Sequence, residues 1–187
     1  MYGYRKSTVK KNPQCEDRAE VLKRAKKRAL YLLGERAFCR AELLSKLSKT
    51  YGDEIAEEVM EYVDELGYIN DGEYAVKLAE YLIHRKKLGL FRAKREMLMK
   101  GLDRELCDNV LSEISTDEVD EELVELIEKR YSTKISDFDD RRRTIAALVR
   151  RGYDFGSVRR CIDYVAENIG ENDADVDEFE DYEQEYL

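Results

Sequence analysis

A recurrence of about 50 residues constrains this chain more than any other feature of its sequence. Three stretches, residues 40–63, 91–114 and 142–165, each join two helix-forming segments through a glycine. The turn glycines Gly52, Gly101 and Gly152 are 49 and 51 residues apart. Periods of this length are typical of tandem arrays of one supersecondary unit. The sequence therefore predicts three copies of a unit that contains a helix, a glycine turn and a second helix.

The composition favours helices along the whole chain. There is one proline, Pro13, among 187 residues, and leucine, glutamate, lysine, arginine and alanine, which are good helix formers, are abundant. Apolar residues recur at helical spacing, as at Leu22, Ala25 and Ala29. No segment alternates apolar and polar residues for long enough to indicate a strand. The expected fold is all-α, with nine helices in three groups of three.

The same pattern predicts the boundaries of the parts. We expect a flexible basic arm at 1–16, three-helix repeats at 17–69, 70–115 and 116–170, and an acidic, disordered tail at 171–187.

Local signals predict where several helices begin and end. Asp17 and Asp103 are expected to cap helices, and Ser115 with Glu118 fits a capping box. Gly67 is expected to end the third helix in a left-handed conformation. In the fourth helix, the spacing of Tyr74, Leu78, Tyr81 and Leu82 predicts that these side chains face inward.

The charge is distributed in blocks of alternating sign. The net charge is −9, and the last 17 residues carry nine carboxylates and no base, so the rest of the chain sums to zero. Within that remainder each repeat has a basic cluster, and acidic blocks separate the clusters. Arginine pairs well with phosphate and with carboxylate, so the clusters are candidate binding surfaces. The alternatives are solvated helix faces and ion pairs between the acidic and basic blocks.

Catalytic and metal-binding patterns are missing from the sequence. The four cysteines form no CxxC pair, and the only histidine, His84, lies in a basic run without a neighbouring acid. No glycine-rich phosphate loop occurs. We therefore expect no catalytic residue, no metal site, no cofactor and no enzymatic activity. There is no apolar run long enough to span a membrane and no signal peptide, which predicts a cytoplasmic protein without a membrane partner.

Five motifs in a fixed order carry a family resemblance. They are Ala29-x-x-Leu32-Leu33-x-x-Arg36, Arg40-x-Glu42-Leu43-x-x-Lys46-Leu47, Gly67-Tyr68-Ile69-Asn70-Asp71-x-x-Tyr74-Ala75, Gly89-x-x-Arg92-x-x-x-Glu96-Met97-x-x-Lys100-Gly101-Leu102 and Leu148-x-Arg150-Arg151-Gly152-Tyr153. Together they resemble the RecX family, regulators of the bacterial recombinase RecA, over residues 19–168. The sequence departs from the family pattern at Cys39, where serine is usual, and at Met97, where leucine is usual.

The resemblance implies a fold, a partner and a mode of action. It implies an elongated, right-handed array of three-helix repeats related to the helix-turn-helix. Such proteins lie in the groove of the RecA–DNA filament and restrain its growth, ATP hydrolysis and strand exchange without catalysing a reaction. The implied partners are the RecA filament and single- or double-stranded DNA, which a monomer would bind weakly on its own.

The basic clusters supply the candidate residues for contacts with RecA or DNA. They are Lys23, Arg24, Lys27, Arg40, Arg85, Lys86, Lys87, Arg92, Lys94, Arg95, Arg141, Arg142, Arg143, Arg150 and Arg151.

The alternative function is that of a helix-turn-helix DNA-binding protein or transcription regulator acting without RecA. A major-groove reader needs a recognition helix with base-reading side chains. Here the helices predicted at 53–66 and 103–114 are acidic, which disfavours that alternative. The acidic tail is expected either to compete with DNA for the arginines or only to increase solubility.

Overall fold

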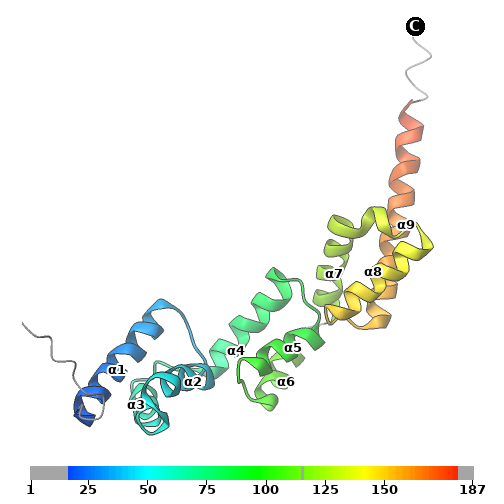
Figure 1. Ribbon diagram of the computed structural model, residues 1–187. Coiled ribbons are helices and arrows are strands. Elements are labelled where there is room, and N and C mark those ends of the chain that lie inside the picture. The colour runs from blue at the N-terminus through cyan, green and yellow to red at the C-terminus, as the bar shows by residue number, and fades with distance from the viewer. Residues whose placement is uncertain (1–16, 115, 181–187) are drawn as a thin grey trace, which may run out of the picture. The chain divides into compact units, whose positions relative to one another are not determined.

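The computed structural model describes the backbone of residues 17–114 and 116–180. These residues form nine α-helices and no strand (Figure 1). The prediction of an all-α fold built from three-helix repeats is therefore confirmed. The predicted basic arm, Ser115 of the predicted capping box and the last seven residues lie outside the described residues. The chain divides into two compact units, residues 1–70 and residues 71–187.

The first unit contains repeat 1, formed by α1 (Arg18–Glu35), α2 (Arg40–Tyr51) and α3 (Asp53–Glu65). Asp17 caps α1 as predicted, because its side chain accepts a hydrogen bond from the backbone of Ala19 at 3.2 Å. Only alanines of α1, Ala25 and Ala29, are fully buried, whereas α2 and α3 contribute larger apolar side chains. Small side chains let α1 approach these helices closely. The core of the repeat consists of Ala25, Ala29, Phe38, Leu43, Leu47, Ile55, Ala56, Val59, Met60 and Val63.

The second unit begins with repeat 2, formed by α4 (Asp71–Glu80), the π-helix η2 (Tyr81–Arg85), α5 (Leu90–Met99) and α6 (Arg104–Ser112). Asp103 caps α6 as predicted. The inward face predicted for α4 is wrong at Tyr81, whose side chain is half exposed. Leu82 is buried as predicted, and Ala75, Ala79 and Ile83, which were not predicted, are buried with it. These four positions follow ordinary helical spacing, so the buried face is turned away from the predicted one and Tyr81 lies outside it.

Repeat 3 completes the second unit with α7 (Thr116–Tyr131), the short 3₁₀ helix η3 (Ser132–Lys134), α8 (Phe138–Arg150) and α9 (Phe155–Glu180). Asp137 caps α8 through hydrogen bonds from two backbone amides, a cap that the sequence analysis missed. The helix α9 continues through residues 171–180, which the sequence analysis assigned to a disordered tail. No proline interrupts the chain after Pro13, so no residue of that type stops α9.

The three predicted turn glycines share a positive φ. Gly52, Gly101 and Gly152 have φ values of 84°, 89° and 92°, in the region that side chains other than glycine rarely adopt. After Gly101, the amide of Leu102 bonds the carbonyl of Met97, and after Gly152, Tyr153 bonds Leu148, both at 3.4 Å. Gly67 also has a positive φ, as predicted. For Gly101 and Gly152 the recurrence in sequence therefore corresponds to a recurring helix end, whereas Gly52, with a ψ of 160°, joins α2 directly to α3.

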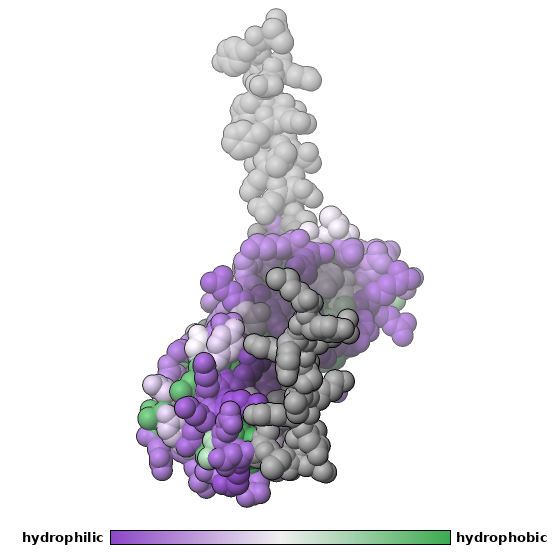
Figure 2. All heavy atoms as spheres, turned by 60° about the vertical axis from the view of Figure 1, so that its left-hand side comes forward, coloured by the Kyte–Doolittle hydropathy of each residue, from purple (hydrophilic) through white to green (hydrophobic). Residues whose placement is uncertain are grey.

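The surface is largely hydrophilic in the view of Figure 2, where apolar residues form small separate patches. Three cysteines are buried: Cys39, Cys107 and Cys161. Within the described ranges, no helix is both long enough and apolar enough to cross a bilayer.

Candidate functional site

The basic residues predicted in repeat 1 lie on two helices. Lys23, Arg24 and Lys27 are exposed on α1. Arg40 is the first residue of α2 and forms ion pairs with Asp64 and, at 4.0 Å, with Glu57, both on α3. Thus Arg40 already has carboxylate partners inside its own repeat.

Ion pairs also engage several of the predicted residues in repeats 2 and 3. Arg92 Nε lies 2.9 Å from Glu96 Oε1 on the same helix, and Arg143 Nη1 lies 2.9 Å from Asp140 Oδ1. Further pairs join Lys87 to Glu122 and Glu125, Lys94 to Asp108, and Arg141 to Asp163. These residues therefore form the internal ion pairs that the sequence offered as an alternative to a binding surface.

Other predicted residues have no such partner. They are exposed, and among the described residues none forms an ion pair or a side-chain hydrogen bond with them: Lys23, Lys27, Arg85, Arg95, Arg142 and Arg150. Lys86 is exposed as well, with its ammonium group 5.4 Å from the centre of the Tyr81 ring. These cations are therefore available to an external anion without the loss of an internal ion pair.

A direct backbone contact joins repeats 2 and 3 within the second unit. The amide of Gly89 donates to the carbonyl of Arg151 at 3.1 Å, and the amide of Phe91 donates to the carbonyl of Gly152 at 3.2 Å. A Cβ atom placed on Gly89 would lie 2.2 Å from both the carbonyl carbon and the oxygen of Gly152. We call this contact the Gly89–Gly152 junction. It fixes the start of α5 against the turn between α8 and α9.

Two predicted binding residues, Arg151 and Lys87, support this junction from inside the protein. The guanidinium of Arg151 donates to the carbonyls of Lys86 at 2.8 Å and Lys87 at 3.2 Å. Lys87 has a positive φ of 52°, and its ammonium group is held by Glu122 and Glu125 of α7. A residue other than glycine is strained at a positive φ, and the ion pairs of Lys87 help to hold it there.

The lone histidine belongs to the same network. His84 Nδ1 lies 2.8 Å from Glu122 Oε1, so one carboxylate group faces both His84 and Lys87. The sequence pattern around His84 does not indicate this partner, because Glu122 is 38 residues away along the chain. Next to the junction, the Tyr153 side chain is buried, and this burial raises the pKa of its hydroxyl to about 12.

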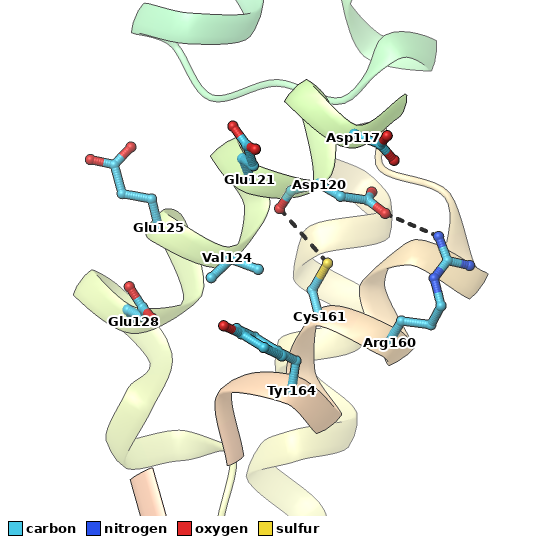
Figure 3. Close-up of a pocket in the computed structure, with 9 residues that line it drawn as sticks. All are labelled: Asp117, Asp120, Glu121, Val124, Glu125, Glu128, Arg160, Cys161 and Tyr164. Carbon is cyan, nitrogen blue, oxygen red and sulfur yellow. Dashed lines mark hydrogen bonds and ion pairs between the residues drawn. The ribbon is translucent and has the colours of Figure 1, made fainter. Parts of the chain in front are cut away.

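A groove between α7 and α9 has the opposite charge. It has a volume of about 500 Å³ and is lined by Asp117, Asp120, Glu121, Val124, Glu125, Glu128, Arg160, Cys161 and Tyr164. Figure 3 shows the carboxylates of α7 along one side, with Arg160 directed at Asp120, 3.0 Å away. Burial raises the pKa of the Cys161 thiol to about 11, so it stays protonated at neutral pH. The carboxylates make this groove unsuitable for a polyanion.

A second pocket lies between α8 and α9. It also has a volume of about 500 Å³ and is lined by Phe138, Arg141, Arg142, Ile145, Phe155 and Arg159. We call it the Phe–Arg pocket. Among its arginines, Arg159 was not predicted as a binding residue. Arg159 belongs to a helix that the sequence marked only by its buried apolar residues. Its position next to α8 becomes visible only in the folded structure.

The network around Lys87 makes a prediction about pH. Hydrogen bonds and charge from Lys129, then Lys87, hold the pKa of Glu125 at about 2, below its usual value of 4.5. A lowered pKa in the folded state stabilises the fold above pH 4.5, and this contribution disappears as the pH falls towards 2. We expect Glu125→Gln to lower the melting temperature at pH 7 and to weaken its dependence on acid.

Circular dichroism melts at several pH values would measure this effect. Glu128→Gln is the matched control, because Glu128 is an exposed carboxylate of the same helix without an ion pair among the described residues. Equal acid dependence of the Glu125→Gln variant and the unchanged protein would contradict the assigned role of Glu125.

Comparisons with known proteins agree with one another. A family model described as the third three-helix domain of RecX matches residues 117–162. A regulatory protein RecX from Deinococcus radiodurans is 33% identical over 148 residues, which are 79% of this chain and 71% of that protein. One from Streptomyces coelicolor is 33% identical over 134 residues, 71% of this chain and 70% of that protein. The crystal structure of RecX from Lactobacillus salivarius has a similar fold, with a TM-score of 0.69, 21% identity, and coverage of 79% of this chain and 97% of that one.

Proposed function

Because this chain belongs to the RecX family of regulatory proteins, we propose that it binds the RecA–DNA filament and inhibits its extension, ATP hydrolysis and strand exchange during recombination and DNA repair. It acts by occupying a surface and catalyses no reaction, so it needs no cofactor. The filament forms on DNA in the bacterial cytoplasm, which is where the protein would act.

One observation carries this proposal. Arg85, Arg95, Arg142 and Arg150 are exposed and lack ion pairs among the described residues, and all four belong to the two repeats that the Gly89–Gly152 junction holds together. Fixed positions matter because cations on a rigid scaffold lose little conformational freedom when they bind. Arginine can donate two parallel hydrogen bonds to a phosphate of DNA or to a carboxylate of RecA.

The distribution of acids disfavours the alternative of a transcription regulator. In a helix-turn-helix protein, the helix after the turn enters the major groove. In repeats 1 and 2 the corresponding helices are α3 and α6, whose first turns carry Asp53, Glu54 and Glu105. Phosphates would repel these carboxylates, so neither helix is suited to reading duplex DNA.

Co-sedimentation with RecA filaments on single-stranded DNA tests the proposal. We expect the protein to pellet with the filaments, to slow their ATP hydrolysis and to stop their extension. A protein that leaves ATP hydrolysis unchanged at saturating concentration, and instead selects one duplex sequence from a random pool, would support the transcription regulator and overturn this proposal.

A further inference from the structure

We propose that the Phe–Arg pocket of repeat 3 binds unstacked bases of single-stranded DNA, with arginines on its rim holding the adjacent phosphates. The inference rests on the proposed function in one respect, which is that a RecA filament would bring single-stranded DNA to this surface. It goes further by naming the ligand, the repeat and the side chains.

The two phenylalanines are unusually placed for residues of their type. Phe138 is the first residue of α8 and is 79% exposed, and Phe155 is the first residue of α9 and is 58% exposed. Both line the same pocket, together with the aliphatic side chain of Ile145. So little of the Phe138 ring is buried that it contributes little to the core. Two exposed rings around one cavity form a surface on which bases can stack.

The charges around the pocket fit the backbone that connects such bases. Three arginines line it and no carboxylate does. Arg142 and Arg159 have no ion pair or side-chain hydrogen bond among the described residues, so both are free to bind phosphate. Arg141 is half-buried and forms an ion pair with Asp163, so it is part of the pocket wall and is not counted among the phosphate-binding arginines. Rings for bases beside cations for phosphates are the usual components of a single-strand site.

The nature of the pocket favours single strands over duplex. In a duplex, each base is stacked between its neighbours, so a phenyl ring reaches it only after the duplex has opened. The carboxylate-lined groove between α7 and α9 belongs to the same repeat and repels phosphates (Figure 3). A strand bound to repeat 3 is therefore restricted to the face that carries the Phe–Arg pocket.

The test measures fluorescence anisotropy of labelled oligothymidine with the full chain and with the double variant Phe138→Ala/Phe155→Ala. Loss of two stacking contacts is expected to weaken binding about 30-fold. Both side chains are exposed, so helicity should be unchanged by circular dichroism. Tyr31→Ala is the matched control, because Tyr31 is an exposed aromatic residue of α1 and is expected to leave the affinity unchanged.

A strand of the same length that lacks its bases separates stacking from phosphate binding. We expect the unchanged protein to bind this abasic strand about as weakly as the double variant binds oligothymidine. Equal affinity of the unchanged protein for both strands would overturn the proposal. So would a double variant that retains full affinity for oligothymidine but loses inhibition of RecA filaments, since the pocket would then bind protein. A protein that binds bases through the pocket but leaves RecA unaffected would refute only the proposed function.

Discussion

Replacing Gly89 with alanine is expected to break the contact between repeats 2 and 3. The added Cβ would lie 2.2 Å from backbone atoms of Gly152, and backbone cannot rotate away as a side chain does. The segments around Gly89 and Gly152 must move apart, which removes the hydrogen bonds from Gly89 to Arg151 and from Phe91 to Gly152. Steric strain together with these bonds should cost about 3 kcal/mol.

Three further glycines supply the controls for this variant, because they separate steric contact from backbone strain. Gly34 lies in α1 with open space around it, so Gly34→Ala should be neutral or stabilise by up to about 1 kcal/mol. Gly52 has open space but a φ of 84° and a ψ of 160°, a region almost confined to glycine, so Gly52→Ala should cost about 1 to 3 kcal/mol through backbone strain alone. Gly152 has a positive φ, and a Cβ added to it would lie 2.3 Å from the amide nitrogen of Arg92. We expect Gly152→Ala to be at least as damaging as Gly89→Ala.

Hydrogen exchange is the appropriate measurement, because a chain with two compact units need not unfold in a single step. Gly89→Ala should increase exchange in α5 and at the turn between α8 and α9, and should leave α1–α3 unchanged. Protection in α5 equal to that of the unchanged protein would show that the junction does not hold the repeats.

Reversing the charges of Arg85 and Arg95 together should weaken binding to RecA filaments about 100-fold. Both side chains are exposed and lack ion pairs among the described residues, so each can make a charge-assisted contact worth about 1.5 kcal/mol, and two such losses multiply. Arg92 is a different case, because it bonds Glu96 and packs against Gly152. Arg92→Glu would therefore disturb the junction as well as the surface charge.

The concentration of Arg85→Glu/Arg95→Glu that halves ATP hydrolysis by RecA would report this loss. Arg130→Glu/Lys134→Glu makes the same change in net charge at exposed residues outside the predicted set, and should inhibit almost normally. Equal inhibition by the two double variants would show that only total charge matters and that the cations of repeat 2 are not a site.

Local signals were enough to predict the elements of the fold. The caps at Asp17 and Asp103 and the positive φ of Gly67 depend on a few neighbouring residues, so the sequence indicates them directly. The π-turn at η2 has no such signal, since its residues also suit an ordinary helix. The orientation of Tyr81 was wrong for another reason, because the small residues Ala75 and Ala79 form the buried face of the helix.

The candidate site could be predicted only as a set of cations. Charge runs identify arginine and lysine clusters, but which members are neutralised depends on contacts between distant segments. Lys87 meets Glu122 and Glu125 across 35 and 38 residues, and no spacing rule connects them. The same reason hid the role of Gly89, which looks like an ordinary turn residue until the backbone of Gly152 is beside it.

The Gly89–Gly152 junction is made by main-chain atoms, and this has an evolutionary consequence. Amides and carbonyls are common to all residues except proline, which lacks the amide, so the two hydrogen bonds do not depend on which side chains surround them. Surface arginines on α5 and α8 can therefore be exchanged, added or lost between relatives while their helices keep the same separation. A lineage whose recombinase changes its surface could adjust the charges facing it one substitution at a time, provided that the two glycines are retained.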